Sequence, residues 1–189
     1  MKRYQISMSC VLVFHANLSH KLVINKVLMI IKMAIFFFSI LEILKQKKPT
    51  AFILENVRHL EKHDNGKTFK IIYESIRKLN YTFDYKIIHA SDFGLPQHRP
   101  RIFMVGFLKD KLKDEFHELP FIFPKEKKLN KSMSDIMNGK VTTHLNSNKE
   151  RVIGFTLRVG GGKSPIEDRR NWDGYIVDNK VVRINSKQG

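Results

Sequence analysis

Residues 51–57 read AFILENV, and residues 97–105 read QHRPRIFMV. The first stretch is a continuous apolar run that leads into the polar pair Glu55 and Asn56, a pattern typical of a buried parallel strand that ends in a loop. The second stretch leaves a loop containing Gly and Pro and enters the apolar run 102–105, which predicts another strand. These two strands decide the fold that we expect.

The surrounding residues predict how these strands are connected. Apolar residues between 36 and 44 recur at helical spacing, and Pro49 ends the pattern. Residues 69–79 show one apolar face of a second helix, and residues 81–88 alternate like a strand. The order helix, strand, helix, strand, loop, strand predicts an α/β domain.

Beyond Leu108 the chain changes character, because charged residues become dense and regular periodicity fades. We expect a boundary in the range 110–125, followed by a basic, loop-rich second lobe. This lobe carries the single tryptophan, Trp172, which fits the lobe's core and a base-stacking role about equally well.

Composition narrows the classes of partner. The 189 residues contain 34 Lys and Arg against 18 Asp and Glu, a net charge of +16, so a polyanion such as nucleic acid is the first partner to test. An apolar content of 42% is enough for a core and excludes disorder as the main state. One cysteine, Cys10, excludes an internal disulfide, and the absence of a metal-spaced Cys/His cluster predicts no metal site.

A membrane role rests on one segment only. Residues 27–44 are mostly apolar, but Lys32 and Glu42 interrupt them, and the uninterrupted run 33–41 is far shorter than the roughly 20 residues needed to span a bilayer. A small basic membrane-associated protein therefore stays an alternative, and we expect no membrane association.

Taken together, ENV at 55–57 and Q-x-R-x-R at 97–101 resemble the paired signatures of the DNA (cytosine-5) methyltransferases. Within this family, the sequence resembles the bacterial methylases of type II restriction-modification systems. Residues 155–189 also resemble the target-recognition region of bacterial members. The resemblance implies a partial Rossmann-like, S-adenosylmethionine-dependent methyltransferase domain over 38–110. It further implies an irregular target-recognition lobe over 111–189, truncated at its C-terminal end.

The resemblance also assigns roles to residues. In this family a cysteine thiolate adds to C6 of cytosine so that C5 can take a methyl group from S-adenosylmethionine. Glu55 matches the acid that relieves charge at N3, and Asn56 is its positioning neighbour. Arg101 matches the arginine at the base O2, Arg99 faces the DNA backbone, and Gln97 orders the loop.

Other arginines are assigned with less support from the residues themselves. Arg158, Arg169 and Arg170 are candidates for contacts with bases or phosphates, although arginines on a basic protein are more often plain solvated charge. Without the combined motifs, Glu55 reads as a solvated cap and Arg101 as part of an ordinary basic loop. The implied partner is double-stranded DNA, bound by a monomer in a bacterial cytoplasm.

Two of the family's motifs do not occur in the sequence: the cofactor loop F-x-G-x-G and the nucleophile motif P-C-Q. The residues around Cys10 match neither motif, so no cofactor-binding residue is assigned. We therefore expect these residues alone to be inactive. The alternative to an enzyme is a basic DNA-binding remnant without chemistry.

Residues 12–37 offer a reason for the missing nucleophile. They can be back-translated so that a frame starting on the third base of each codon reads GFPCQPFSQAGYKQGFDDNKNGNLFF without a stop. The junction of Met29 and Ile30 must give an Asp codon, and a CAT codon for His15 gives Cys. We expect residues 1–37 to be an out-of-frame segment without a role in the domain.

Overall fold

A computed structural model describes residues 11–15, 26–156, 164–168 and 171–184. The chain divides into two compact units. Unit 1 is built mainly from residues 26–87 and 101–123, and unit 2 mainly from residues 88–100 and 124–184.

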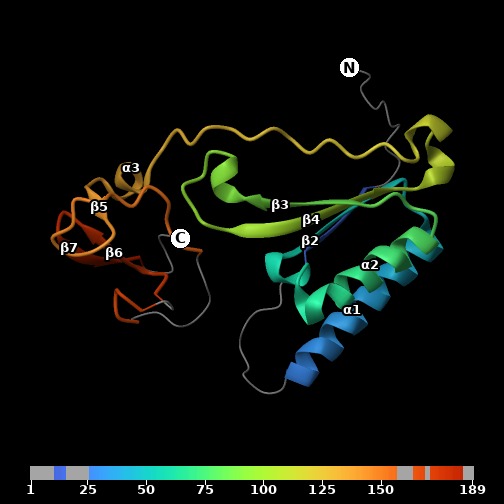
Figure 1. The fold of residues 1–189 in the computed structure, drawn as a ribbon, viewed down its shortest axis with the longest axis horizontal. Coiled ribbons are helices and arrows are strands. Elements are labelled where there is room, and N and C mark those ends of the chain that lie inside the picture. The colour runs from blue at the N-terminus through green and yellow to red at the C-terminus, as the bar shows by residue number, and fades with distance from the viewer. Residues whose placement is uncertain (1–10, 16–25, 157–163, 169–170, 185–189) are drawn as a thin grey trace. The chain divides into compact units, whose positions relative to one another are not determined.

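Unit 1 contains a four-stranded sheet (Figure 1). Its strands are β1 (Val11–His15), β2 (Ala51–Val57), β4 (Pro100–Phe107) and β3 (Asp84–His89), in this spatial order. Strand β2 is parallel to β1 and antiparallel to β4. The three strands predicted from the apolar runs are thus confirmed, and β1 is an addition.

Helices α1 (Lys26–Lys47) and α2 (Lys67–Lys78) pack on one face of this sheet. Side chains alternate along a strand, so the residues of β2 and β4 that face the helices are those at every second position. Helix α2 buries residues three and four positions apart, as an amphipathic helix does. The shared core comprises Ile40, Leu44, Phe52, Leu54, Phe69, Ile72, Ile76, Ile102 and Met104, among others.

Part of the segment 1–37 has regular backbone structure in unit 1, and the out-of-frame origin of this segment stays a prediction. The backbone of β1 pairs with β2, and α1 begins at Lys26 rather than near residue 36. Strand β2 has an open edge, and the apolar, β-branched segment 11–15 has the composition that pairs with such an edge. The residues that extend α1, 26–35, include Leu, Met, Lys and Ala, which favour a helix, together with the β-branched Val27 and three Ile, which favour it less.

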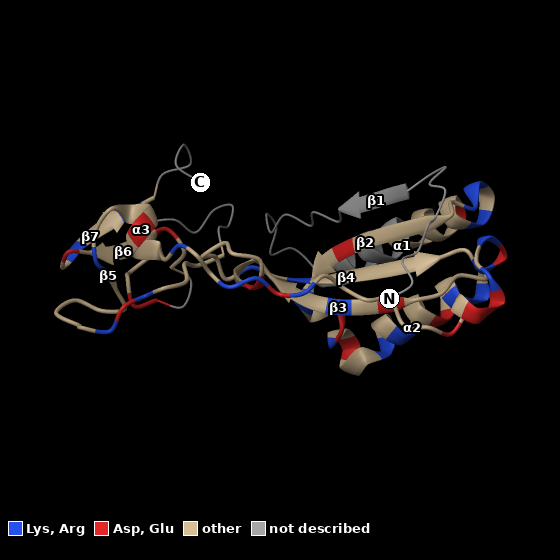
Figure 2. Ribbon diagram, turned by 90° about the horizontal axis from the view of Figure 1, so that it is seen from above, with Lys and Arg blue, Asp and Glu red and all other residues tan. Residues whose placement is uncertain are grey.

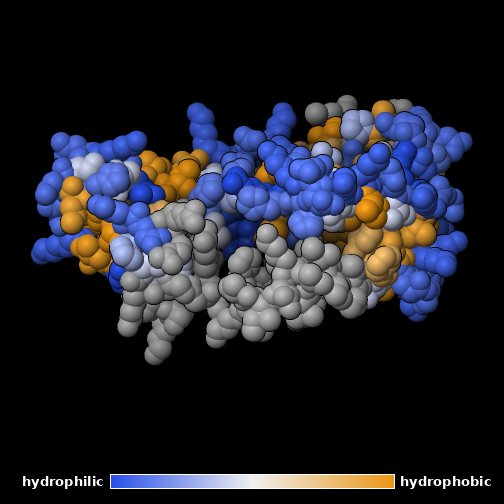
Figure 3. Space-filling model, turned by 60° about the horizontal axis from the view of Figure 1, so that its bottom comes forward, coloured by the Kyte–Doolittle hydropathy of each residue, from blue (hydrophilic) through white to orange (hydrophobic). Residues whose placement is uncertain are grey.

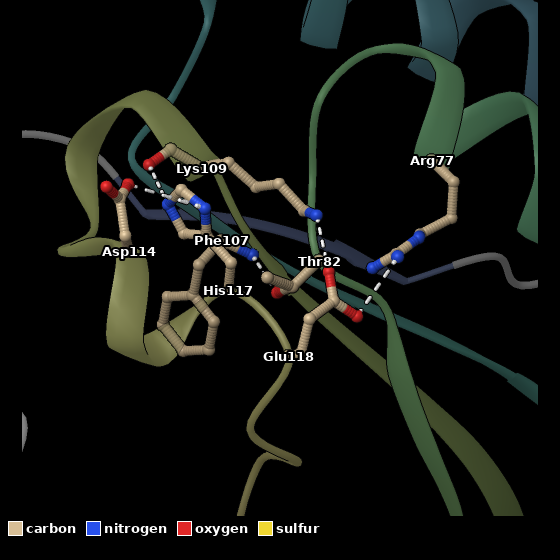
Figure 4. A network of polar contacts seen from close by, with 7 residues as sticks. All are labelled: Arg77, Thr82, Phe107, Lys109, Asp114, His117 and Glu118. Carbon is tan, nitrogen blue, oxygen red and sulfur yellow. Dashed lines mark hydrogen bonds and ion pairs between the residues drawn. The ribbon is translucent and has the colours of Figure 1, made fainter.

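Unit 1 ends at Phe123, which lies within the range 110–125 expected for the boundary. A polar network holds this segment (Figure 4). Lys109 Nζ lies 2.8 Å from Glu118 Oε1, and Arg77 Nη2 of α2 lies 3.6 Å from Glu118 Oε2. The ring of His117 bonds the Lys109 carbonyl oxygen at 2.9 Å. Part of the charge-dense stretch that follows Leu108 is therefore attached to α2.

Unit 2 is short of regular structure, as expected for the second lobe. It contains α3 (Met133–Met137) and an antiparallel sheet of β5 (Val141–Thr142), β6 (Gly174–Val177) and β7 (Lys180–Arg183). Asp178 and Asn179 turn the β6–β7 hairpin, and both have positive φ, as a two-residue type I′ turn requires. Met133, Val141, Tyr175 and Val177 form its small apolar cluster.

Short 3-10 turns link the remaining elements: Arg58–Leu60, His63–Gly66, Ala90–Asp92, Lys109–Lys111 and Asp114–Phe116. Where residues are described, the face in Figure 3 is mostly hydrophilic, and its apolar side chains gather in separate small areas. Among the helices that the structure describes, none has the length and apolar character needed to cross a bilayer.

Candidate functional site

The structure brings together Glu55 and Arg101, two of the residues chosen from the motifs. Glu55 lies near the end of β2, and its register partner on β4 is Phe103. Arg101 lies two positions from Phe103, so its side chain is on the same face and diagonal to Glu55. The Nε of Arg101 lies 2.7 Å from Oε1 of Glu55.

This ion pair lies on the sheet face opposite the helices. Leu54 and Ile102 point into the helix-covered core. Glu55 follows Leu54 and Arg101 precedes Ile102, so both side chains point to the other face. Their side chains are only 11% and 19% exposed, which excludes an ordinary solvated surface pair. A charge-assisted hydrogen bond of this length in a partly dry site orients both groups. In Figure 2 the strands of unit 1 are largely uncharged, and isolated charged bands interrupt them.

Asn56 has a local role. Its Oδ1 accepts a hydrogen bond from the backbone N–H of Val57 at 2.8 Å, which shapes the chain just after the carboxylate. This contact matches the positioning function that the motif implies for Asn56. It does not bring the amide to Glu55 or Arg101 through any contact described here.

Strand β1 reaches the same end of the sheet. The parallel register pairs His15 with Glu55, so the last residue of β1 lies beside the carboxylate-bearing position on β2. Position 15 is the one at which the hypothesised alternative reading frame would encode a cysteine, if the codon of His15 is CAT. Cys10 lies outside the described residues.

The loop before the second motif belongs to unit 2. The backbone N–H of His89 donates to Asp92 Oδ2 at 3.0 Å, which closes the turn Ala90–Asp92. Gly94 follows with a φ of +87°, a left-handed backbone conformation that residues with a Cβ atom rarely adopt. This turn fixes the path of the chain into Gln97.

Gln97 lies on a short backbone pairing within unit 2. It forms an isolated parallel bridge with Gly154, and the N–H of His98 donates to the Gly154 carbonyl oxygen at 2.8 Å. The Thr156 hydroxyl donates to the His98 carbonyl oxygen. The sequence-based role of Gln97, ordering its loop, thus has a backbone basis, and contact with DNA stays a prediction.

Arg99 is half-buried and makes no hydrogen bond or ion pair with the described residues. Arg158, Arg169 and Arg170 lie outside the described residues. Trp172 is half-buried, so its ring is neither a fully buried core residue nor a fully exposed platform.

Arg151, which the sequence analysis passed over, stacks on an aromatic ring in unit 2. The guanidinium of Arg151 lies 4.3 Å from the ring centroid of Phe155. Arg and Phe four positions apart in an irregular segment carry no periodic signal, so the sequence offered no reason to select this pair.

Neither the turn after β2 nor Gly106 matches the glycine loop that the family uses for S-adenosylmethionine. The turn that follows β2 reaches Gly66, and no Gly-x-Gly occurs in it. Gly106 lies within β4, and a Cβ there would lie 2.4 Å from the Phe52 ring, so this glycine serves packing and leaves no ligand space. We derive no step through the cofactor. No group of His, Cys, Asp and Glu suited to a metal ion occurs among the described residues.

Comparison with known proteins identifies the family. A sequence model of the C-5 cytosine-specific DNA methylase family matches residues 32–187, which include both motifs. The chain belongs to this family. The resemblance drawn from ENV and Q-x-R-x-R is therefore confirmed, as is the partial α/β methyltransferase fold.

Curated bacterial relatives of this chain are similar over part of their length. The type II methyltransferase M.SsoII of Shigella sonnei is 48% identical over 105 residues, covering 56% of this chain and 27% of the relative. M.HaeII of Haemophilus aegyptius is 59% identical over 80 residues, covering 42% and 25%. The solved Spodoptera frugiperda DNMT2 has 19% identity and a TM-score of 0.40, covering 58% and 35%. The methylase chain thus matches about a quarter of the curated relatives' length.

Proposed function

We propose that this chain is the base-binding portion of a bacterial type II cytosine-5 DNA methyltransferase from a restriction-modification system, with double-stranded DNA as its partner. The observation that carries the proposal is the Glu55–Arg101 pair, at 2.7 Å, formed by the two family motifs on adjacent strands. A monomer in the bacterial cytoplasm is the setting that the family membership favours.

The proposed chemistry concerns the polar edge of a flipped cytosine. Glu55 hydrogen-bonds or donates a proton at N3, where charge develops when a nucleophile adds to C6. Arg101 donates to the base O2, and its Nε holds the Glu55 carboxylate in one orientation. Gln97 orders the preceding loop, and Arg99 contacts the DNA backbone.

These 189 residues contain no family nucleophile, so we propose that they do not methylate DNA by themselves. No thiolate is available to add to C6, and removal of a covalent nucleophile generally takes most of the rate with it. The binding loop for S-adenosylmethionine is also missing from the sequence.

We further propose that the cysteine codon exists in another reading frame of the same locus. The register supports this, because His15, whose CAT codon would contribute to the cysteine, pairs with Glu55. The nucleotide sequence tests it: the shifted frame is expected to be open and to encode F-x-G-x-G upstream. Stop codons in that frame, or CAC at position 15, would remove the idea.

The function is tested with the purified chain, a cytosine-containing duplex and labelled S-adenosylmethionine. We expect weak duplex binding that falls steeply with salt and no label in the DNA. Glu55→Gln is the control for turnover, because any methyl transfer that depends on the family mechanism would be lost in this variant. Turnover above background that Glu55→Gln abolishes would contradict the proposed inactivity, and absence of duplex binding at low salt would contradict the DNA partner.

A further inference from the structure

The Glu55–Arg101 pair lies at one end of an apolar strip on the sheet face opposite the helices. Along this face the register of β2 with β4 gives successive cross-strand rows: Ala51 with Phe107, Ile53 with Val105, Glu55 with Phe103, and Val57 with Arg101. The strip is formed by the first two rows and by Phe103, and its side chains are buried or half-buried. The carboxylate of Glu55 thus has apolar groups on one side and a guanidinium on the other.

Phe103 is the side chain directly opposite Glu55 in this arrangement. Its neighbours Ile102 and Met104 lie in the helix-covered core, so alternation along β4 directs Phe103 to the face that carries Glu55. Side chains directly opposite each other on an antiparallel pair have Cβ atoms roughly 5 Å apart. Phe103 therefore adjoins the carboxylate, while Arg101 reaches it along the diagonal.

The low exposure of the pair requires apolar cover. The side chains of Glu55 and Arg101 are 11% and 19% exposed. Val57, opposite Arg101, is 42% exposed, so solvent reaches the end of the strand pair there. On its other side Glu55 adjoins the backbone of β1 at position 15. Phe103, half-buried and directly opposite Glu55, is the apolar group best placed to keep water from the carboxylate.

An aromatic ring suits this position for electrostatic reasons. The ring edge carries partial positive charge, so it is compatible with neighbouring carboxylate oxygens. A phenyl ring also has no hydrogen-bond donor that would compete with Arg101 for Glu55. Where water is excluded, the 2.7 Å charge-assisted hydrogen bond from Nε to Oε1 is stronger than it would be in solvent.

We propose that Phe103 is a positioning residue of the base-binding site, whose ring excludes water from the Glu55–Arg101 hydrogen bond and holds the carboxylate in one orientation towards the cytosine. The inference rests on the proposed function, because the cytosine is the group that Glu55 meets there. It adds a residue that lies outside both family motifs. Phe103 touches no reacting atom in this scheme and acts only through Glu55.

The test measures exchange of the Arg101 Nε–Hε proton with solvent, by NMR on the isotope-labelled chain. In the unaltered chain this proton is held in the hydrogen bond to Glu55, so we expect slow exchange. Phe103→Ala admits water to the bond and is expected to speed the exchange about tenfold, which corresponds to the net loss of one hydrogen bond. Phe103→Leu keeps an apolar side chain at this position and is expected to restore most of the slow exchange.

Phe107→Ala is the matched control. Phe107 lies on the same strand and the same face, is also half-buried, and is paired with Ala51 instead of Glu55. Both variants remove the same atoms from β4, so a purely structural role predicts the same acceleration in both. We expect Phe107→Ala to leave the Arg101 Nε–Hε exchange unchanged. Equal acceleration in the two variants, or none in Phe103→Ala, would overturn the proposal.

A second measurement needs no variant. Nuclear Overhauser contacts between the Phe103 ring protons and the side-chain protons of Glu55 or the Arg101 Hε are expected in the unaltered chain, and their absence would contradict the proposed shielding. Both measurements are made without DNA. Failure of the unaltered chain to bind a duplex at low salt would therefore defeat the proposed function, whereas the exchange data alone decide whether Phe103 shields the pair.

Discussion

The two units differ in how their functional side chains are placed. In unit 1 Glu55 and Arg101 lie on paired strands, where register and alternation decide which face each side chain occupies. Arg158, Arg169 and Arg170 of the second lobe were chosen by charge alone, whereas Gln97 and Arg99 of unit 2 came from a motif in the loop before β4. A residue on a regular strand can be placed by counting from a motif, whereas a charge in a loop cannot.

The largest effect is expected from a core substitution that destabilises unit 1 and leaves the stability of unit 2 unchanged. Phe52 of β2 is fully buried, and the centroid of its ring lies 5.5 Å from that of the Tyr81 ring. Phe52→Ala removes a large core side chain and is expected to destabilise unit 1 by about 3–5 kcal/mol. Amide hydrogen exchange measures this: protection falls in β2 and β4 and persists in the β6–β7 hairpin.

The conservative change Met104→Leu is the control for that experiment, since Met104 is also buried in unit 1 and the swap conserves volume. Loss of protection in the hairpin together with β2 in Phe52→Ala would show that the two units unfold as one.

The next effect tests the ion pair itself. Arg101→Gln leaves the mostly buried Glu55 carboxylate without its cation and is expected to cost about 1–3 kcal/mol. Adding Glu55→Gln recovers part of the loss, because two neutral amides replace an unpaired charge. Urea denaturation of the single and double variants measures the coupling, and strictly additive losses would show that the pair contributes nothing to unit 1.

Tyr81 makes the stability of unit 1 depend on pH at the alkaline end. Its hydroxyl donates to the Pro49 carbonyl oxygen at 2.8 Å, and burial raises the pKa of Tyr81 from 10.0 to about 12. The folded state holds this proton more tightly, so its stabilisation is complete below pH 10 and is lost as pH rises towards 12. Tyr81→Phe is expected to lower the free energy of unfolding by about 1 kcal/mol at neutral pH. The variant is also expected to lose less stability than the unaltered chain between pH 10 and 12, because it has no phenol to ionise.

Thermal unfolding between pH 8 and 12, for the unaltered chain and for Tyr81→Phe, measures the difference. Parallel curves for the two proteins would contradict a buried, proton-retaining phenol.

The smallest effect is expected at the network in Figure 4. Hydrogen bonding and the charge of Lys109, with Arg77, lower the pKa of Glu118, so its contribution is present at neutral pH and is lost as pH falls through that lowered pKa. Glu118 is largely exposed, so Glu118→Gln is expected to change the melting temperature only slightly and less at high salt. A change as large as that of Arg101→Gln would contradict this ranking.

Much of unit 1 could be predicted from the sequence, and the reasons are local. The run at 51–54 and the Q-x-R-x-R strand carry period-two or continuous apolar patterns, and Pro49 marks the end of α1. The start of α1 at Lys26 was missed, because the mostly apolar residues before 36 give no clear amphipathic period. The pairing of β1 with β2 depends on a long-range edge that no local pattern contains.

The site was predictable only in part for similar reasons. The motifs identified Glu55 and Arg101, and the antiparallel register supplied their contact. Phe103 lies opposite Glu55 through the same register, which joins strands far apart in the sequence. Sequence spacing alone does not encode this pairing.

The central claim is that Glu55 and Arg101 act on the flipped cytosine of a methyltransferase. Methyl transfer to a cytosine duplex by the frame-restored protein tests it most directly, with Glu55→Gln and Arg101→Gln compared at equal DNA binding. We expect activity in the restored protein and a loss of at least about 100-fold in Glu55→Gln, the range for a positioned acid. Full activity in both variants would contradict the claim.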